Sequence, residues 1–252
     1  MKLLCYFILF FSSTLCAQIK EKDSLNLKAD LSITGFWQTG NVETIIFRAK
    51  SNFSFKPLKE LTFKTINSYV YQEFGKEKAD EDILSLNFLY LHQDKKIHPF
   101  LLAFISTNFR REIDLRYLLG AGVTYQIIKE KKDWLKFSVS SEYEKTVFGR
   151  ANFNRVAFNG NKVINTVRAT FWVSGSHSIF KNKMIVTHEN YYQPSLEESD
   201  NYRWQTDVGI EFPIWKYINF KINYLHTFES IVIENQVQQD QFLTFGLKFK
   251  SY

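Results

Sequence analysis

The chain has 252 residues, of which 17% are aromatic and 23% are charged, and its formal net charge is +6. Four prolines and ten glycines are too few for a linker-rich or disordered chain. A mean hydropathy of −0.24 excludes a helical membrane protein. Many aromatic residues beside many charges favour a transmembrane β-barrel, in which only alternate residues face lipid. A soluble secreted β-sandwich is the alternative.

The chain begins with a segment typical of an export signal. Lys2 supplies a positive charge, residues 3–11 form an apolar run, and Ala17 suits cleavage before Gln18. The apolar run is too short to cross a bilayer as a helix. We therefore predict a cleaved signal peptide over residues 1–17, a short periplasmic lead over residues 18–27, and one outer-membrane barrel domain over residues 28–252.

Both cysteines of the chain, Cys5 and Cys16, fall within the predicted signal peptide. The mature chain would contain no disulfide, so its stability must come from the sheet itself. Acylation of Cys16, as in a lipoprotein, is disfavoured because Leu15 is a poor residue immediately before a lipidated cysteine. Export also disfavours nucleic acid as a partner of this basic chain.

Alternation of apolar and polar residues predicts strands in the first half of the chain at residues 28–38, 45–55, 61–73, 83–93, 98–108 and 115–128. Gly40 and Asn41 form a tight-turn signal between the first two. A charged loop is expected at residues 75–82. The fourth strand then directs its even-numbered apolar side chains outward, namely Leu84, Leu86, Phe88 and Tyr90. The fifth strand is apolar on both faces, which leaves its orientation open.

The second half continues with predicted strands at residues 134–146, 163–179, 184–193, 202–212, 217–228 and 241–249. The last of these has a purely apolar face, formed by Leu243, Phe245, Leu247 and Phe249. Such a strand near the chain end is expected to close a barrel. The longest predicted loop covers residues 147–161, and most short and long connections alternate. Periplasmic turns and outer loops of a barrel differ in this way, whereas a soluble sandwich gives no reason for it.

The total is about twelve antiparallel strands of roughly 10–13 residues, close to the length that crosses a bilayer at a tilt. Their even number would place both chain ends on the periplasmic side. We predict an all-β fold consisting of a single transmembrane antiparallel β-barrel, integral to the cell outer membrane. Outer-membrane lipids and, through the C-terminal strand, the barrel-assembly machinery are the expected partners, and no cofactor is expected.

Three parts of the sequence resemble a known family. Residues 189–203 read ENYYQPSLEESDNYR, residues 35–42 read GFWQTGNV, and residues 243–247 read LTFGL. These runs resemble the family called domain of unknown function 481, which includes salt-induced outer membrane proteins of Gram-negative bacteria. The resemblance covers essentially the mature chain and implies an outer-membrane barrel with no agreed activity and no catalytic residues. One departure is at the end of the chain, where a barrel usually has an aromatic residue on its lipid-facing side. Phe249 continues the alternation on that side, whereas the last residue, Tyr252, does not.

Charged residues recur on the faces that are predicted to point inward. Eleven of them are candidates for lining the lumen: Arg48, Lys50, Arg116, Lys136, Glu142, Glu144, Arg168, Arg203, Asp207, Glu211 and Lys221. Inward charges can line an aqueous pore and set its selectivity. They can equally pair with each other and fill the barrel. Because both signs are present, the sequence leaves both interpretations open.

An enzyme acting on lipid would need a nucleophile and a base together on the outer surface. His177 precedes Ser178 and His188 precedes Glu189, but adjacent residues of a strand point to opposite faces. A partner on a neighbouring strand is left open. The remaining histidines have no metal-ligand spacing, so no metal site is expected. We predict that the chain is not an enzyme.

The sequence therefore favours an outer-membrane barrel that forms a narrow or gated pore for small solutes. A non-conducting structural or stress-adaptive envelope protein is the alternative. An outer-membrane enzyme that modifies lipid comes third.

Overall fold

A computed structural model describes residues 27–39, 43–130 and 133–250 of the protein. The predicted signal peptide, all but the last residue of the predicted periplasmic lead, the Gly40-Asn41 turn and Tyr252 lie outside the described residues. Within them, no helix is long and apolar enough to cross a membrane. A short 3₁₀ turn, η1 (Val156–Phe158), is the one helical element of the described chain.

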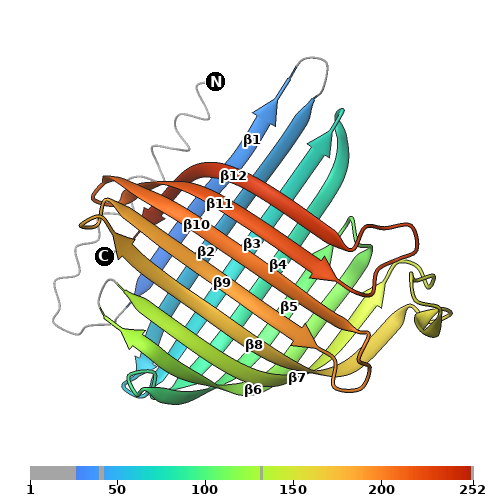
Figure 1. Ribbon diagram of the computed structural model, residues 1–252, viewed down its shortest axis with the longest axis horizontal. Helices are drawn as coiled ribbons and strands as arrows, with labels where there is room; N and C mark the ends of the chain where they lie inside the picture. Colours follow the sequence, from blue (N-terminus) through green and yellow to red (C-terminus); the bar gives the residue numbers. More distant parts are fainter. Residues whose placement is uncertain (1–26, 40–42, 131–132, 251–252) are drawn as a thin grey trace.

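Twelve strands make up the described chain. Their bounds are β1 (Lys28–Gln38), β2 (Thr44–Leu58), β3 (Leu61–Phe74), β4 (Glu77–Leu91), β5 (Ile97–Asn108), β6 (Ile113–Lys129), β7 (Trp134–Phe148), β8 (Val163–Ile179), β9 (Met184–Pro194), β10 (Tyr202–Trp215), β11 (Ile218–Glu229) and β12 (Gln239–Lys250). Each strand pairs antiparallel with its neighbours in sequence, and β1 pairs with β12, so the sheet closes into a barrel (Figure 1). The prediction of an all-β antiparallel barrel of about twelve strands is confirmed.

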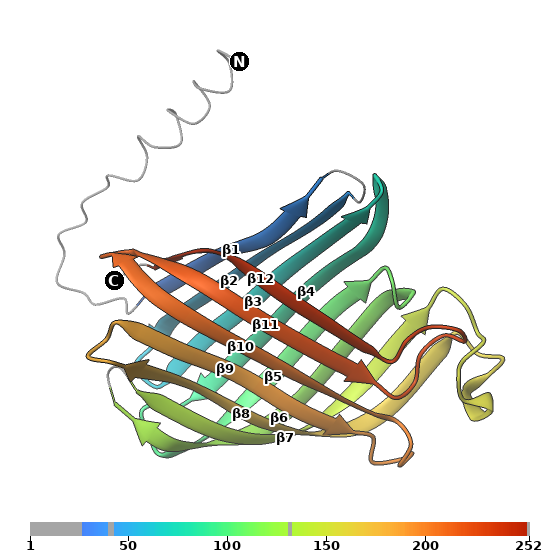
Figure 2. The same cartoon turned by 45° about the horizontal axis from the view of Figure 1, so that its top comes forward.

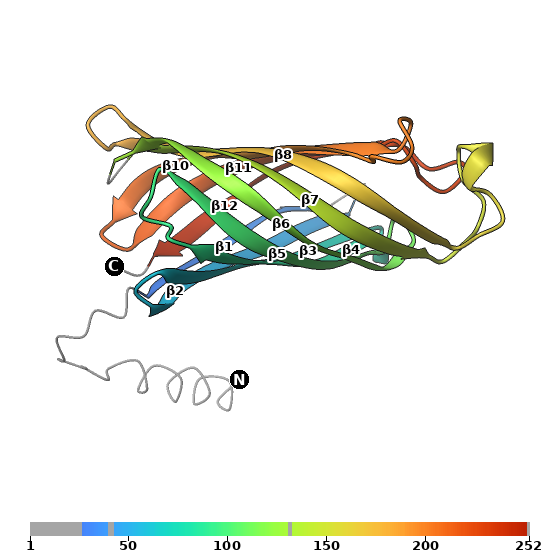
Figure 3. The same ribbon diagram turned by 90° about the horizontal axis from the view of Figure 1, so that it is seen from below.

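The two ends of the barrel differ. β1 begins and β12 ends at one end, which also carries the connections at residues 59–60, 92–96, 180–183 and 216–217 (Figure 1 and Figure 3). We call this the terminal end. The opposite end carries the longer connections at residues 149–162, 195–201 and 230–238 (Figure 2), and we call it the loop end. Two short connections, at residues 75–76 and 109–112, also lie there.

The seam between β1 and β12 follows from the apolar face of the last strand. Leu31 pairs with Phe249 and Ile33 pairs with Leu247. All four side chains lie on the outer face and are 38–42% exposed, whereas Thr34 is 3% exposed inside the barrel. Apolar side chains outside and polar side chains inside are the pattern of a barrel that faces lipid.

β4 starts earlier than the sequence predicts. In place of the predicted charged loop at residues 75–82, β4 begins at Glu77, which pairs with Phe74 across a two-residue turn. Gly75 and Lys76 form this turn with positive φ angles of 58° and 69°. Two such residues give a turn whose twist matches that of the flanking strands, so the hairpin continues up to it in spite of its charges.

The predicted orientation of β4 is wrong. The side chains expected to face lipid point into the barrel instead, namely Leu84, Leu86, Phe88 and Tyr90. On the outer face, Asn87 donates a hydrogen bond to Ser85 (3.1 Å), and Asn67 of β3 donates one to Thr65 (3.2 Å). Polar groups that satisfy one another can face lipid at reduced cost. Alternation alone therefore does not fix which face of a strand is the outer one.

β5, whose orientation the sequence leaves open, completes the inward apolar cluster. Phe100 and Leu102 are each 3% exposed and pack with Ile66 of β3 and the inward side chains of β4. Gly122 of β6 leaves the space that Phe100 fills, because a Cβ atom at this glycine would lie 2.5 Å from Phe100 Cζ. One side of the barrel interior is thus apolar, in addition to the inward charges that the sequence predicts.

Candidate functional site

The structure directs all eleven predicted lumen-lining side chains toward the barrel interior. Nine are 7% exposed or less: Arg48, Arg116, Glu142, Glu144, Arg168, Arg203, Asp207, Glu211 and Lys221. The other two, Lys50 and Lys136, line an internal cavity. The eleven do not form one continuous lining, because they fall into separate groups with different partners. Whether any of them lines a conducting pore stays a prediction.

The first group lies toward the loop end and is centred on Glu144, which is 1% exposed. Its carboxylate accepts hydrogen bonds from Arg168 Nε (2.8 Å) and Arg203 Nη2 (2.6 Å), and Arg116 Nε lies 3.8 Å away. Arg116 also binds Glu229 through both terminal nitrogens, at 2.8 and 2.7 Å. Buried guanidinium groups need such partners, because an unpaired buried charge is costly. These side chains therefore form a densely paired cluster inside the barrel.

The second group crosses the middle of the barrel. Asp207 on β10 accepts hydrogen bonds from Arg48 and Lys50 on β2, each at 3.0 Å. It also accepts one from Asn223 at 3.0 Å. Lys50 reaches Glu189 on β9 as well, at 3.4 Å. Because β2 and β9 are not neighbours in the sheet, these contacts span the lumen.

The third group lies toward the terminal end. Glu211 is 1% exposed and accepts hydrogen bonds from Lys248 (2.8 Å) and Asn219 (2.7 Å). Lys136 and Lys221 have no carboxylate oxygen within 4.0 Å among the described residues. The predicted set thus combines paired and unpaired charges.

Several partners were not among the eleven candidates. Sequence reasoning missed Glu189, Glu229 and Lys248, which complete ion pairs of the predicted residues. Lys248 lies on the polar face of the closing strand, and this position is a signal that could have identified it. Glu229 is the last residue of β11, where alternation gives no information.

The interior holds two cavities separated by a thin layer of side chains. The larger cavity, which we call the vestibule, has a volume of about 1000 Å³ and reaches Asn182 and Lys216 in the turns of the terminal end. The smaller one has a volume of about 140 Å³ and lies toward the loop end. In the described chain, four residues border both cavities: Lys50, Ile66, Trp172 and Glu189. We call this layer the septum.

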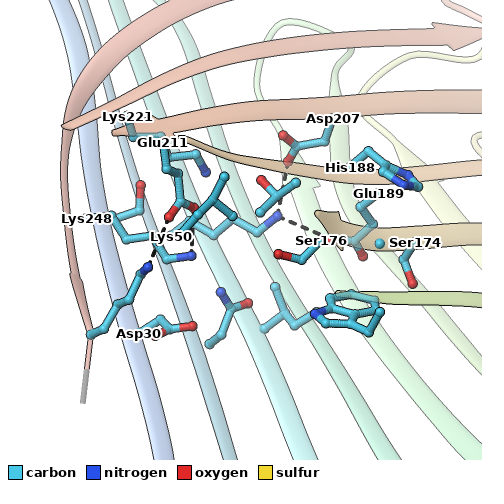
Figure 4. Close-up of a pocket in the computed structure, with 18 of the residues that line it drawn as sticks. Asp30, Lys50, Ser174, Ser176, His188, Glu189, Asp207, Glu211, Lys221 and Lys248 are labelled. Carbon is cyan, nitrogen blue, oxygen red and sulfur yellow. Dashed lines mark hydrogen bonds and ion pairs between the residues drawn. The ribbon is translucent and has the colours of Figure 1, made fainter. Parts of the chain in front are cut away.

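Two contacts across the lumen hold the septum closed. The first is the bridge from Lys50 to Glu189 and Asp207 (Figure 4). The second is Trp172 of β8, whose ring centroid lies 6.2 Å from that of Phe88 on β4 in an edge-to-face arrangement. Lys50 and Glu189 keep side-chain exposures of 16% and 25%, against 1% for the carboxylate of the first group. The septum is therefore the more hydrated and less tightly bound barrier.

An apolar cap covers the first group at the loop end. Phe153 of the 149–162 loop and Ile233 of the 230–238 loop form a β-bridge and are 3% and 0% exposed. They pack with Ile113, Phe148 and Ile231. Phe148 and Ile231 also border a gap of about 10 Å³ that Arg116 and Glu144 line. The cap therefore keeps water away from the buried ion pairs below it.

Glu112 ties the cap to the 109–112 connection. It accepts hydrogen bonds from Arg150 Nε (2.6 Å) and Gln236 Nε2 (3.1 Å), which belong to the two loops of the cap. The bond from Arg150 is the main cause that lowers the pKa of Glu112 below its ordinary value. A lowered carboxyl pKa means that this contribution to stability is present at neutral pH and is lost as the pH falls through the folded-state value.

We expect Ile233→Ala to loosen the cap. Removing a fully buried isoleucine side chain costs about 2–5 kcal/mol, so the two loops should open more often. Protease cleavage within residues 149–162 and 230–238 should then be at least about ten-fold faster than in the parent protein in lipid vesicles. Val237→Ala in the same loop is the control, because Val237 is 69% exposed. Equal cleavage rates for the parent and both variants would show that this cluster does not hold the loops.

Two histidines stack against each other between β8 and β9. His177 and His188 stack with centroids 5.5 Å apart, and Asn190 Nδ2 lies 3.1 Å from His188 Nδ1. The residue opposite His188 on β8 is Gly175, which has no hydroxyl group. Ser178 borders the vestibule instead. In the described part of the chain, no group of three or more His, Cys, Asp and Glu could hold a metal ion.

Comparison with family models identifies the chain. The model described as "Protein of unknown function, DUF481" matches residues 32–250. The chain belongs to the DUF481 family. The resemblance stated from the sequence is thereby confirmed, and the matched residues include all the groups described above. No curated protein matches this DUF481 chain in sequence.

Solved structures show the same fold at low sequence identity. The structure titled NanC porin is 9% identical, with a TM-score of 0.53, and the alignment covers 89% of this chain and 100% of that one. The translocator domain of the autotransporter NalP from Neisseria meningitidis is 11% identical, with a TM-score of 0.42 and coverages of 94% and 92%. OmpT of Vibrio cholerae is 7% identical, with a TM-score of 0.42 and coverages of 93% and 100%. The likeness to the NanC porin structure, whose TM-score exceeds 0.5, shows that the DUF481 chain has the fold of an outer-membrane barrel, and this likeness concerns the fold alone.

Proposed function

We propose that the protein is an integral barrel of the cell outer membrane that acts as a gated pore for small solutes, with the septum as its gate. The observation that carries the proposal is that four side chains separate a vestibule of about 1000 Å³ from a second cavity, in the part of the chain described. A barrel that served only as a scaffold would not require a large internal cavity that is closed by so thin a layer of side chains. The proposal assigns no catalysis to the chain.

Beyond the septum, the proposed route would run through the smaller cavity toward the loop end. The smaller cavity is bordered by Arg110 and Arg111 of the 109–112 connection. The side chain of Arg110 is 35% exposed, so this cavity approaches the surface at the loop end. Solutes would therefore pass beside the 109–112 connection and past Arg116 and Arg203, which border this cavity next to Glu144.

The septum has properties that suit a gate. Its ion pair between Lys50 and Glu189 is long, at 3.4 Å, and the Glu189 side chain is 25% exposed, so water can take the place of Lys50 at this carboxylate. Trp172 is partly exposed and its indole nitrogen makes one weak hydrogen bond, to Ser140 Oγ at 3.4 Å. Rotation of this ring and separation of this pair would join the two cavities without breaking the sheet.

The outer face and the strand number support the membrane setting. Side chains such as Leu101, Leu119 and Leu243 are 58–63% exposed on the outside of the barrel, as lipid-facing residues must be. With an even number of strands, the terminal end faces the periplasm. The vestibule would then open to the periplasm, and the 109–112 connection would face the exterior.

Single-channel recording in a planar bilayer tests the gate. We expect discrete current steps for the parent protein, and a several-fold larger time-averaged conductance for Trp172→Ala because the septum loses its largest side chain. Val173→Ala is the matched control, since Val173 is the next residue and faces outward with 39% exposure. It should conduct like the parent.

The opposite outcome favours a different function. If the parent and Trp172→Ala barrels are folded by heat-modifiability on a gel and both stay silent, the pore proposal fails. The non-conducting structural envelope protein then becomes the better interpretation. The buried ion pairs around Glu144 and the apolar cap are the features that support it.

A further inference from the structure

The vestibule joins two features, namely lysines with no carboxylate at ion-pair distance among the described residues and a wall of aromatic rings. We propose that it binds organic anions whose charged group is attached to an apolar ring, such as aromatic sulfonates and carboxylates. The proposal names a solute class for the proposed pore. It rests on the proposed function, because solutes must enter the vestibule from the terminal end.

The charges of the vestibule are unbalanced. Seven lysines and four carboxylates border it: Lys50, Lys64, Lys136, Lys216, Lys221, Lys248 and Lys250 against Asp30, Glu189, Asp207 and Glu211. Two of the carboxylates are already shared between two cations each, because Asp207 binds Arg48 and Lys50, and Glu211 binds Lys248 and Lys250. A net positive charge is left over in a partly enclosed space, which attracts anions.

Three of the lysines have no carboxylate partner. Among the described residues, no carboxylate oxygen lies within 4.0 Å of the amino groups of Lys64, Lys136 and Lys221. Lys221 is 7% exposed. Removing an ammonium group from water without a counter-charge is unfavourable, so a bound anion would supply what these groups lack.

The aromatic wall lies between two of these lysines. It consists of Phe88, Tyr90 and Phe100, whose ring centroids are 5.4–5.6 Å apart and which are only 3–7% exposed, and of Trp134, whose partly exposed ring lies 5.5 Å from Lys136 Nζ. Lys136 Nζ lies 5.8 Å from the centroid of Tyr90, and Lys64 pairs with Phe88 in the register of β3 and β4. A flat apolar ring on this wall would place an attached anionic group within reach of an ammonium group on either side.

Serine hydroxyl groups of the lining supply hydrogen bonds. Ser138, Ser174 and Ser176 border the vestibule, and Figure 4 shows Ser174 and Ser176 beside Glu189. Hydroxyl groups can donate to sulfonate or carboxylate oxygens. An inorganic anion would leave the aromatic wall uncovered, a neutral ring would leave the lysines unpaired, and an organic cation would be repelled. The organic anion is the class that satisfies both features.

Calorimetric titration of the refolded barrel in phosphatidylcholine nanodiscs tests this site. The probes are naphthalene-2-sulfonate, its neutral analogue naphthalene-2-sulfonamide, and the small anion methanesulfonate, with empty nanodiscs measured to subtract partition into lipid. We expect naphthalene-2-sulfonate to bind at least about ten-fold more tightly than either of the other two. Equal affinity for the sulfonamide, or for methanesulfonate, would overturn the proposed class.

A double variant tests the residues. Lys64→Gln with Lys136→Gln should weaken naphthalene-2-sulfonate binding at least about ten-fold, while the barrel stays folded by heat-modifiability. Lys183→Gln is the matched control, because Lys183 is exposed in the 180–183 turn at the same end and does not border the vestibule. Unchanged binding in the double variant would overturn the site.

The titration does not depend on current through the barrel. Specific binding by a barrel that is silent in planar bilayers would refute the pore and keep the anion site. Conducting channels that do not bind the sulfonate would refute the anion site and keep the pore.

Discussion

Glu144→Gln is expected to lower the free energy of unfolding by about 3–5 kcal/mol. The variant keeps the shape of the side chain but removes the negative charge that Arg168 and Arg203 share at 2.8 and 2.6 Å. All three side chains are 5% exposed or less, so water cannot replace the lost charge. Guanidinium-induced unfolding and refolding in phosphatidylcholine vesicles, followed by tryptophan fluorescence, measures the change.

Glu142→Gln provides a matched control. Glu142 is also 1% exposed and lies two residues away on the same strand. Its carboxylate accepts hydrogen bonds from the hydroxyl groups of Thr170 (2.8 Å) and Ser140, and no cation lies within 4.0 Å of it in the described chain. A glutamine oxygen can still accept a bond there, so the loss should be about 1 kcal/mol. Equal losses in the two variants would mean that burial of a carboxylate, and not the arginine cluster, sets the cost.

The arginine cluster also links the sheet to a loop. Arg168 donates hydrogen bonds to the carbonyl oxygens of Gln193 and Asn201, both at 3.2 Å. These residues flank the 195–201 connection at the loop end. Neutralising Glu144 should therefore loosen this connection as well as the strands. Stability at the loop end and the proposed permeability at the septum thus depend on different residues, and we expect that they can be varied separately.

Much of the sheet could be predicted because the two sides of a barrel strand face different solvents. The predicted strand at residues 163–179 has the bounds of β8, and the predicted faces of β1 and β12 are those of the structure. In these strands lipid selects apolar side chains on one side and the filled interior selects polar ones on the other. In such strands, the alternation of apolar and polar residues directly indicates which side chains face outward.

Alternation is not informative where the interior is itself apolar. On β4 the inward residues are Phe88 and Tyr90, while the outward residues Ser85 and Asn87 satisfy each other by hydrogen bonding. The sequence shows two distinct faces but not which of them is inside. The aromatic wall of the vestibule was missed for this reason, although Phe88 and Tyr90 were recognised as lying on one face of the strand.

The septum and the cap could not be predicted from local patterns. Lys50 and Glu189 are 139 positions apart, and Phe153 meets Ile233 from a different loop. Such pairs depend on which strands stand opposite across the lumen and on how the loops fold over the end. The alternation of polar and apolar residues identified the inward charges. It carried no information about which of these charges form ion pairs with each other.

Leu119→Arg is expected to cost about 2–4 kcal/mol in the free energy of unfolding in vesicles. Leu119 lies near the middle of β6, faces outward and is 58% exposed, so an arginine there would sit in the centre of the bilayer. Ile97→Arg is the matched control. Ile97 is similarly exposed, at 61%, but it is the first residue of β5 and lies at the terminal end, where an arginine reaches the interface and should cost about 0–1 kcal/mol.

The difference in the free energy of unfolding between these two variants tests whether lipid surrounds the barrel. In water, an exposed arginine at either position would be tolerated, because surface substitutions usually change stability by less than about 0.5 kcal/mol. A depth-dependent cost arises only when lipid surrounds the middle of the barrel and headgroups surround its ends. Equal and small losses for Leu119→Arg and Ile97→Arg would therefore contradict a membrane-spanning barrel, and with it the pore. A large loss at Leu119 alone would place the outer face of β6 in hydrocarbon and leave the septum as the barrier between the two sides.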